Sequence, residues 1–186
     1  MTNVLDFPIL SLLIFLPLAG VLPVLLIPKE KTGLIRWVTL IVTFANFLIS
    51  LVLIPNFNNN THQMQFVERY EWIPSIGIQY FLGIDGISYL IVLLTTMISF
   101  ISVMASWTAI EHRVKEFHVA MLLTEVGMLG TFMALDFILF YIFWEVTLIP
   151  MYFIVGIWGG PRRVYAAVKF FLFTMFGSVF MLIAIL

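Results

Sequence analysis

The chain has 186 residues, of which 62% are hydrophobic and only 10% are charged, a composition outside the range of soluble domains and typical of a protein embedded in lipid. Lys and Arg number 9 and Asp and Glu number 10, so no basic excess points to nucleic acid. Cysteine is absent, which excludes disulfides, thiol catalysis and thiolate-ligated iron–sulfur clusters from these residues. The first residues contain Asp6 and no basic residue, so we interpret the first apolar segment as retained rather than cleaved as a signal peptide.

Six apolar segments are long enough to cross a hydrocarbon core of about 30 Å. They cover approximately residues 7–28, 34–55, 87–110, 117–135, 137–158 and 164–186. The sequence therefore predicts an all-α, polytopic membrane helix bundle. We divide it into an N-terminal three-helix region, 1–110, and a second helical region, 111–186.

The segment 56–86 between the second and third predicted helices contains an Asn-rich turn and then alternating aromatic and polar residues. We expect it to fold over the membrane surface as an interfacial loop. Tyr70, Trp72 and Tyr80 fit an interfacial aromatic belt, although a plain amphipathic loop without a binding role explains them as well.

The orientation of the helices follows from the basic residues in the loops. Loops after the odd-numbered helices carry seven of them, and loops after the even-numbered helices carry Arg69 alone. The seven are Lys29, Lys31, Arg36, Arg113, Lys115, Arg162 and Arg163. This asymmetry predicts that the odd loops are cytoplasmic and that the N-terminus lies on the opposite side. A tight turn at Asp136 makes the fourth and fifth helices antiparallel neighbours, and we expect Asp136 to cap the fifth helix.

Two glutamates lie deep within predicted spans, where a charged side chain costs on the order of 2.5–3.5 kcal/mol and is usually functional. Glu125 in the fourth span and Glu145 in the fifth each lie roughly 12 Å from their own interface. They flank the membrane midplane, so a proton path can step between them. The alternative is that each makes a structural hydrogen bond to a neighbouring helix.

Pro150 follows Glu145 by five residues and removes the backbone hydrogen bond to the carbonyl of Val146. The sequence predicts a helix kink there, and a freed carbonyl that needs a hydroxyl or a water molecule as its partner. Tyr141 and Tyr152 share the helix face of Glu145, so their hydroxyls can extend a hydrogen-bonded relay or can serve packing alone.

Lys169 lies about 7 Å inside the sixth span, where snorkelling to the interface and a buried relay role are equally compatible with its position. The histidines provide no ligand pair inside the bundle, because His62, His112 and His118 lie in loops or at span ends. We therefore predict neither a metal site nor a haem in this chain.

Three segments resemble the antiporter-like, proton-translocating subunits of respiratory complex I, in particular the NADH-quinone oxidoreductase chain M or subunit 4 type. They are FLGIDGIS at 81–88, LDFILFYIFWEVTLIPMYFIVGIWGG at 135–160 and YAAVKFFLFT at 165–174. The resemblance covers essentially the whole chain. The connection WGGPRRVYAAVKF is also similar to chain 4 of the cyanobacterial and plastid relative of complex I.

The resemblance implies that Glu145 is the fifth-helix glutamate of a proton channel, that Glu125 is a second membrane glutamate, and that Lys169 is a lysine of the same relay. Family members have roughly twice as many helices, including a broken seventh helix with the lysine that pairs with the glutamate. This chain ends at Leu186, within the sixth predicted helix. Residues 111–186 are accordingly expected to be the start of the proton-channel helix repeat, truncated at the C-terminal end.

The leading hypothesis is a membrane subunit of a NADH (or ferredoxin):quinone oxidoreductase that translocates protons and holds no cofactor itself. Flavin, iron–sulfur clusters and quinone are then expected in partner subunits, and paralogous antiporter-like subunits beside it in a bacterial inner membrane or a thylakoid membrane. The alternatives are a subunit of a multi-subunit Na+/H+ antiporter or of a membrane-bound hydrogenase, and a purely structural membrane chain.

Overall fold

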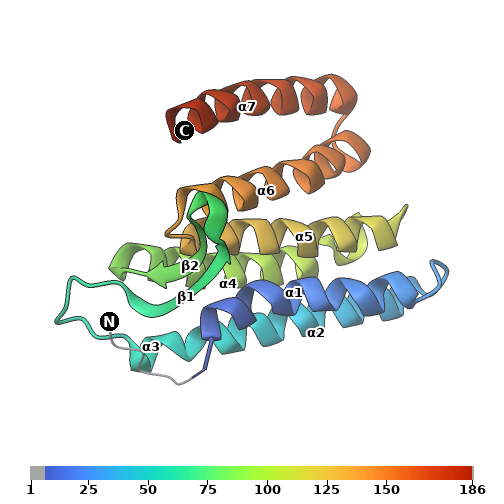
Figure 1. Ribbon diagram of the computed structural model, residues 1–186. Coiled ribbons are helices and arrows are strands. Elements are labelled where there is room, and N and C mark those ends of the chain that lie inside the picture. The colour runs from blue at the N-terminus through green and yellow to red at the C-terminus, as the bar shows by residue number, and fades with distance from the viewer. Residues whose placement is uncertain (1–6, 186) are drawn as a thin grey trace.

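The structure is a computed structural model that describes residues 7–185, so Asp6 and Leu186 lie outside the described residues. Six long helices run back and forth side by side, with α7 at one edge packed on α6 (Figure 1). They are α1 (Ile9–Leu26), α2 (Thr32–Leu51), α4 (Gly86–Ala109), α5 (Val114–Met133), α6 (Phe137–Trp158) and α7 (Arg163–Ile185), and a short α3 (Leu53–Asn56) extends α2. The predicted polytopic membrane helix bundle is confirmed.

Five of these helices are long and apolar enough to cross a membrane, and α5 is the remaining one. The sequence of α5 includes Lys115, Glu116 and Glu125, which lower its hydropathy. Lys115 and Glu116 lie at the start of α5, where Glu116 is exposed, whereas Glu125 lies inside the bundle, because α5 contacts α1, α2, α4 and α6. The hydrophobic core crosses the predicted boundary at residue 110, since residues of α1 and α5 belong to one buried cluster. The division into two regions stays a prediction.

Within the predicted interfacial loop 56–86, residues 65–84 form a β-hairpin, and the interfacial position of this segment stays a prediction. Strand β1 (Gln65–Ile73) pairs antiparallel with β2 (Ile78–Ile84), with Tyr70 opposite Tyr80. The alternation of aromatic and polar residues is the period of two that a strand requires, and it was the signal for this hairpin. At the turn, Gly77 has a φ of 72°, a conformation that favours glycine.

One half of the hairpin is part of the protein core. Phe66, Leu82 and Ile84 are buried together with Leu10 and Leu13 of α1. The other half projects outward, and Tyr70 and Trp72 at its tip are exposed. The aromatic-belt role of these residues stays a prediction, whereas the base of the hairpin is fixed to the bundle.

Asp136 immediately precedes α6 and caps it, as predicted. Its side chain accepts hydrogen bonds from the backbone N–H groups of Ile138 and Leu139, both at 3.0 Å. Its second oxygen accepts from the backbone N–H of Gln79 at 3.3 Å. Asp136 therefore caps the helix and also ties β2 to the start of α6.

The chain connectivity places the hairpin at one end of the bundle and the α4–α5 loop at the other. We expect a single cysteine at Asn59 and a single cysteine at Glu111, both exposed positions, to react with a membrane-impermeant thiol reagent from opposite sides of a sealed vesicle. The chain has no native cysteine, so the unmodified protein is the blank. Labelling of both positions from the same side would contradict the arrangement of spans.

Candidate functional site

Glu125 lies in the interior of the bundle on α5, with only 1% of its surface exposed. The side-chain amide of Asn46 on α2 donates to Glu125 Oε1 at 2.8 Å. Glu125 Oε2 and Asn46 Oδ1 are also buried, and neither has a hydrogen-bond partner among residues 7–185. A buried polar atom without a partner is costly, so this pair has unused capacity to bind a proton, a hydroxyl or a water molecule.

The Asn46 side chain belongs to a polar stripe along α2. Thr39, Thr43, Asn46 and Ser50 follow one another at intervals of four, three and four residues, and each is at most 1% exposed. Ser50 Oγ continues the stripe to Thr96 Oγ1 of α4 at 2.8 Å. The sequence interpretation missed these residues, although a helical period of polar residues within an apolar segment was the signal for them.

His118 is a second buried group that the sequence interpretation set aside as a residue at a span end. It is fully buried in α5, and neither ring nitrogen has a hydrogen-bond partner among the described residues. It precedes Glu125 by seven residues, about two helical turns, and so lies on the same face of α5. Residues 7–185 contain no group of three or more side chains that could hold a metal ion.

Glu145 is half-buried on α6, and its Oε1 atom is buried without a hydrogen-bond partner in the described part of the chain. Helix α6 contacts α5 through Thr147 and Phe143, because Gly127 and Gly130 of α5 lie directly against these two residues. Both are two positions from Glu145, and two positions correspond to about half a turn. Glu145 therefore faces away from α5.

The face of α6 that carries Glu145 is the face toward α7. Tyr152, seven positions after Glu145, packs its ring against Phe171 of α7 with centroids 5.4 Å apart. Gly156, one turn further on, lies against Ala167 of α7. The predicted relay residues Tyr141 and Tyr152 thus share the Glu145 face, but no hydrogen bond within residues 7–185 joins either hydroxyl to Glu145. The relay stays a prediction.

The two glutamates lie at similar depth but on opposite sides of the α5–α6 pair. Since Gly127 lies against Thr147, Glu125 is level with Ile149, which is four residues or about 6 Å along the helix from Glu145. Glu125 faces α2 and Glu145 faces α7. A proton step between them would have to pass the contact between α5 and α6, so the step stays a prediction.

Pro150 is buried within α6, which continues through it from Phe137 to Trp158. Because proline has no N–H group, the carbonyl of Val146 has lost its helical donor one residue beyond Glu145. The Val146 carbonyl is adjacent in sequence to Glu145; its proximity to the unpartnered carboxylate oxygen and the kink angle both stay predictions.

Lys169 lies on the outer face of α7, away from both glutamates. It is exposed and two positions from Ala167, the residue that faces α6. Its Nζ atom lies 5.8 Å from the ring centroid of Tyr165, in a shallow depression that Arg162 and Phe173 also line. Lys169 therefore points away from Glu145, and the choice between snorkelling and relay stays open.

Glu68 is a buried carboxylate that the sequence interpretation missed, because its role depends on a contact 58 residues away. It is 6% exposed on β1, and it accepts hydrogen bonds from the backbone N–H groups of Leu10 at 2.8 Å and Ser11 at 3.1 Å. The Ser11 hydroxyl also donates to Glu68 and lies 2.8 Å from the hydroxyl of Tyr80. Glu68 thus caps the start of α1, where the preceding residue, Pro8, provides no side-chain cap.

Burial raises the pKa of Glu68 above its usual value, and the hydrogen bonds from Ser11 and Leu10 offset only part of this rise. A carboxyl group with a raised pKa stabilises the folded state below its unfolded pKa, and this stability is lost as the pH rises through the folded pKa. We therefore expect the α1–hairpin junction to weaken as the pH rises above about 4.5. Hydrogen exchange at Leu10 and Ser11, corrected for the intrinsic rate, measures this.

The Glu68→Gln variant is the control for this prediction, because glutamine does not titrate. In this variant, the free energy of opening the α1–hairpin junction should not change as the pH rises above about 4.5. An equal pH dependence in the variant would assign the effect to another group.

Apolar helices that pack side by side, with carboxylates in the interior, define a polytopic membrane protein with ionisable groups at membrane depth. Two family profiles match the chain: "NADH-ubiquinone oxidoreductase chain 4, amino terminus" at residues 11–136, and "NADH:quinone oxidoreductase/Mrp antiporter, TM" at residues 134–186. The chain belongs to the NADH-ubiquinone oxidoreductase chain 4 family.

Its relatives are considerably longer than the chain. NADH-quinone oxidoreductase subunit M of Rickettsia typhi is 42% identical over 188 residues, covering 98% of this chain and 38% of the relative. Subunit M of Rhodobacter capsulatus is 47% identical over 181 residues, covering 95% of this chain and 35% of the relative. The chain therefore spans little more than a third of the length of these relatives.

Solved structures show the same fold. A chain of respiratory complex I from Thermus thermophilus with bound NADH is 30% identical with a TM-score of 0.78, over 94% of this chain and 34% of that chain. The Mrp complex from a Dietzia species contains a chain with a TM-score of 0.77 and 20% identity, over 94% of this chain and 19% of that chain. The second likeness shows the fold alone.

Proposed function

We propose that this chain is part of a membrane subunit of NADH:quinone oxidoreductase that translocates protons, while electron transfer takes place in other subunits. The observation that carries the proposal is a pair of carboxylates at membrane depth, Glu125 and Glu145, each with a buried oxygen that has no hydrogen-bond partner among residues 7–185. Asn46 holds the other oxygen of Glu125. The family to which the chain belongs supports the oxidoreductase assignment over a purely structural role.

A buried carboxyl group with a free oxygen can accept a proton from a water or hydroxyl that reaches it, and can release the proton when a nearby charge changes. Glu125 and Glu145 offer two such positions at similar depth, one on each side of the α5–α6 pair. A distant conformational or electrostatic change is then coupled to proton uptake on one side of the membrane and release on the other.

The proposal includes partners and location. We infer that this chain holds no redox cofactor and that flavin, iron–sulfur clusters and quinone are bound by partner subunits, as its membership of an oxidoreductase family supports. Paralogous antiporter-like subunits are the expected membrane neighbours. A bacterial inner membrane fits the relatives from Rickettsia and Rhodobacter better than a thylakoid does. The excess of basic residues in the loops after the odd-numbered predicted helices supports an N-terminus on the non-cytoplasmic side.

The test uses the complete protein, assembled in its complex and reconstituted into sealed vesicles. NADH and a soluble quinone should drive proton movement across the vesicle membrane in proportion to NADH oxidation, and a protonophore should abolish the gradient without stopping oxidation. A Na+/H+ antiporter subunit is the second candidate, favoured by the family profile at residues 134–186, whose description includes the Mrp antiporter. Exchange of Na+ for protons down an imposed gradient, without any response to NADH, would favour that candidate.

A further inference from the structure

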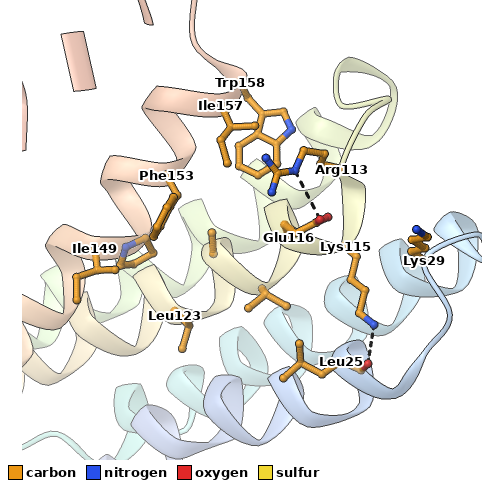
Figure 2. A pocket seen from close by; sticks show the side chains of 13 residues that line it. Leu25, Lys29, Arg113, Lys115, Glu116, Leu123, Ile149, Phe153, Ile157 and Trp158 are labelled. Atoms are coloured by element: carbon orange, nitrogen blue, oxygen red, sulfur yellow. Dashed lines mark hydrogen bonds and ion pairs between the residues drawn. The ribbon is translucent and has the colours of Figure 1, made fainter. Parts of the chain in front are cut away.

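A groove of about 550 Å³ opens between α1, α5 and α6, at the end of the bundle where most basic residues lie (Figure 2). Its walls are apolar below the opening, with Leu123 of α5 and Ile149 and Phe153 of α6 among the lining side chains. Along α6 the groove reaches from Trp158 to Ile149, a distance of about 13 Å. The proposed proton-binding residues Glu125 and Glu145 do not line it.

The opening of the groove is basic. Lys29, Arg113 and Lys115 lie around it, and Glu116 is the one acidic residue in the lining. Lys115 Nζ donates to the carbonyl of Leu25 at 2.6 Å (Figure 2) and also to the carbonyl of Ile27 at 2.9 Å, and the two bonds anchor its charge beside the end of α1. The side chains of Lys29, Arg113 and Lys115 are hydrogen-bond donors. Their three positive charges exceed the single negative charge of Glu116.

Arg113 has an unusual backbone conformation. Its φ is 53°, in the left-handed region that residues other than glycine rarely adopt. This conformation places Arg113 immediately before α5, where its guanidinium lies 3.5 Å from Glu116 and about half of its side chain is exposed. Such a backbone conformation persists where the surrounding structure imposes it and is enriched at binding sites.

Trp158 completes the opening on the α6 side. Its indole N–H donates to the carbonyl of His112 at 2.9 Å, and its ring packs edge-on against Phe117 with centroids 5.1 Å apart. Indole rings with one apolar and one polar side favour the level of the lipid head groups. Trp158 therefore marks the depth at which the groove passes from the interface into the hydrocarbon.

We propose that this groove binds an anionic phospholipid, with its phosphate at Lys29, Arg113 and Lys115 and one acyl chain along Leu123, Ile149 and Phe153. The charge of the opening complements an anionic head group, and the apolar length below it complements an acyl chain. A basic pocket between membrane helices is a recognised arrangement for such lipids. An apolar polypeptide helix in the groove would leave the cations at its opening without an anion.

The experiment uses phosphatidylglycerol with a photoactivatable group in its acyl chain, and the complete protein assembled in its complex in phosphatidylcholine vesicles. Light should cross-link the probe to peptides that contain Leu123 and the Ile149–Phe153 stretch of α6. Unlabelled phosphatidylglycerol should compete for this labelling, whereas added phosphatidylcholine or soluble glycerol phosphate should not. These two arms separate a bound anionic lipid from general lipid contact and from a site for a free phosphate.

Two double variants test the charges. Lys29→Gln with Arg113→Gln should weaken labelling about 25-fold, since each basic residue near the membrane surface contributes about fivefold in affinity. Lys31→Gln with Arg162→Gln removes the same charge from the same end but outside the groove, so its labelling should equal that of the unmodified protein. Lys29 lies on an exposed loop, so Lys29→Gln alone does not disturb the start of α5. Its labelling should lie between that of the unmodified protein and that of the Lys29→Gln, Arg113→Gln double variant.

Three outcomes would overturn the proposal. The first is equal labelling by a phosphatidylcholine probe, which shows contact without selectivity. The second is competition by glycerol phosphate, which assigns the cations to a soluble anion. The third is a cross-link from another polypeptide at Ile149 or Phe153 with no lipid adduct, which shows that protein fills the groove.

Discussion

Replacement of Glu145 by glutamine should leave the protein assembled and reduce coupled proton pumping by about tenfold or more. Glutamine preserves the size of the side chain and its hydrogen-bonding capacity but cannot take up and release a proton. Glutamine is neutral, so the exchange introduces no new charge. It breaks no hydrogen bond of Oε1, because this atom has no partner within the described residues. The measurement is NADH-driven proton uptake into vesicles, divided by the amount of assembled complex.

Two variants accompany it. Glu145→Asp keeps a titrating group but withdraws it by one methylene, so an intermediate pumping rate is expected. Glu125→Gln should be milder than Glu145→Gln, and it keeps an oxygen that can accept from Asn46. Pumping at the unmodified rate in Glu145→Gln would leave a structural hydrogen bond as the better account of this residue.

Gly127→Ala should destabilise the bundle by about 1–3 kcal/mol or more and lower the amount of assembled protein. A Cβ atom at Gly127 would lie 2.2 Å from Thr147 Oγ1 and 2.9 Å from the backbone nitrogen of Thr147. A rotation of the threonine side chain can relieve the first contact, but only separation of α5 from α6 relieves the second. The measurements are the yield of assembled complex and its thermal unfolding midpoint.

Gly177→Ala is the matched control, because it makes the same change in another membrane helix. Nothing lies within 4 Å of a Cβ atom at Gly177, and alanine is the better helix former. Its yield and unfolding midpoint should equal or exceed those of the unmodified protein. Similar losses in both variants would mean that α5–α6 contact is not the cause.

The helices were predictable because their signal is local. A span of 22 mostly apolar residues after a capping aspartate is sufficient for α6, and the predicted range 137–158 is the observed one. The hairpin was missed because the segment was considered as a loop between membrane spans, although its alternating residues have the period of a strand. The hydrophobic period and the residue propensities that indicate a helix or a strand extend over a few neighbouring residues. They can therefore be recognised without information from elsewhere in the chain.

The candidate site was predictable in part. The depth of Glu125 and Glu145 follows from counting residues along a helix, since the rise per residue is constant. The face on which each carboxylate lies does not follow from counting, because it depends on which helix packs beside it. Asn46 reaches Glu125 from 79 residues away, and Glu68 caps α1 from 58 residues away.

By itself, the sequence determined that this is a multi-span membrane protein with two carboxylates at depth and a capped turn at Asp136, because composition, period and capping act within one segment. Only the tertiary structure decided that Glu125 faces α2, that Glu145 faces α7 and that Lys169 points away from both. Helix packing sets these directions through contacts such as Gly127 against Thr147. Side-chain volume at those contacts, summed over distant segments, fixes how each helix is rotated about its own axis.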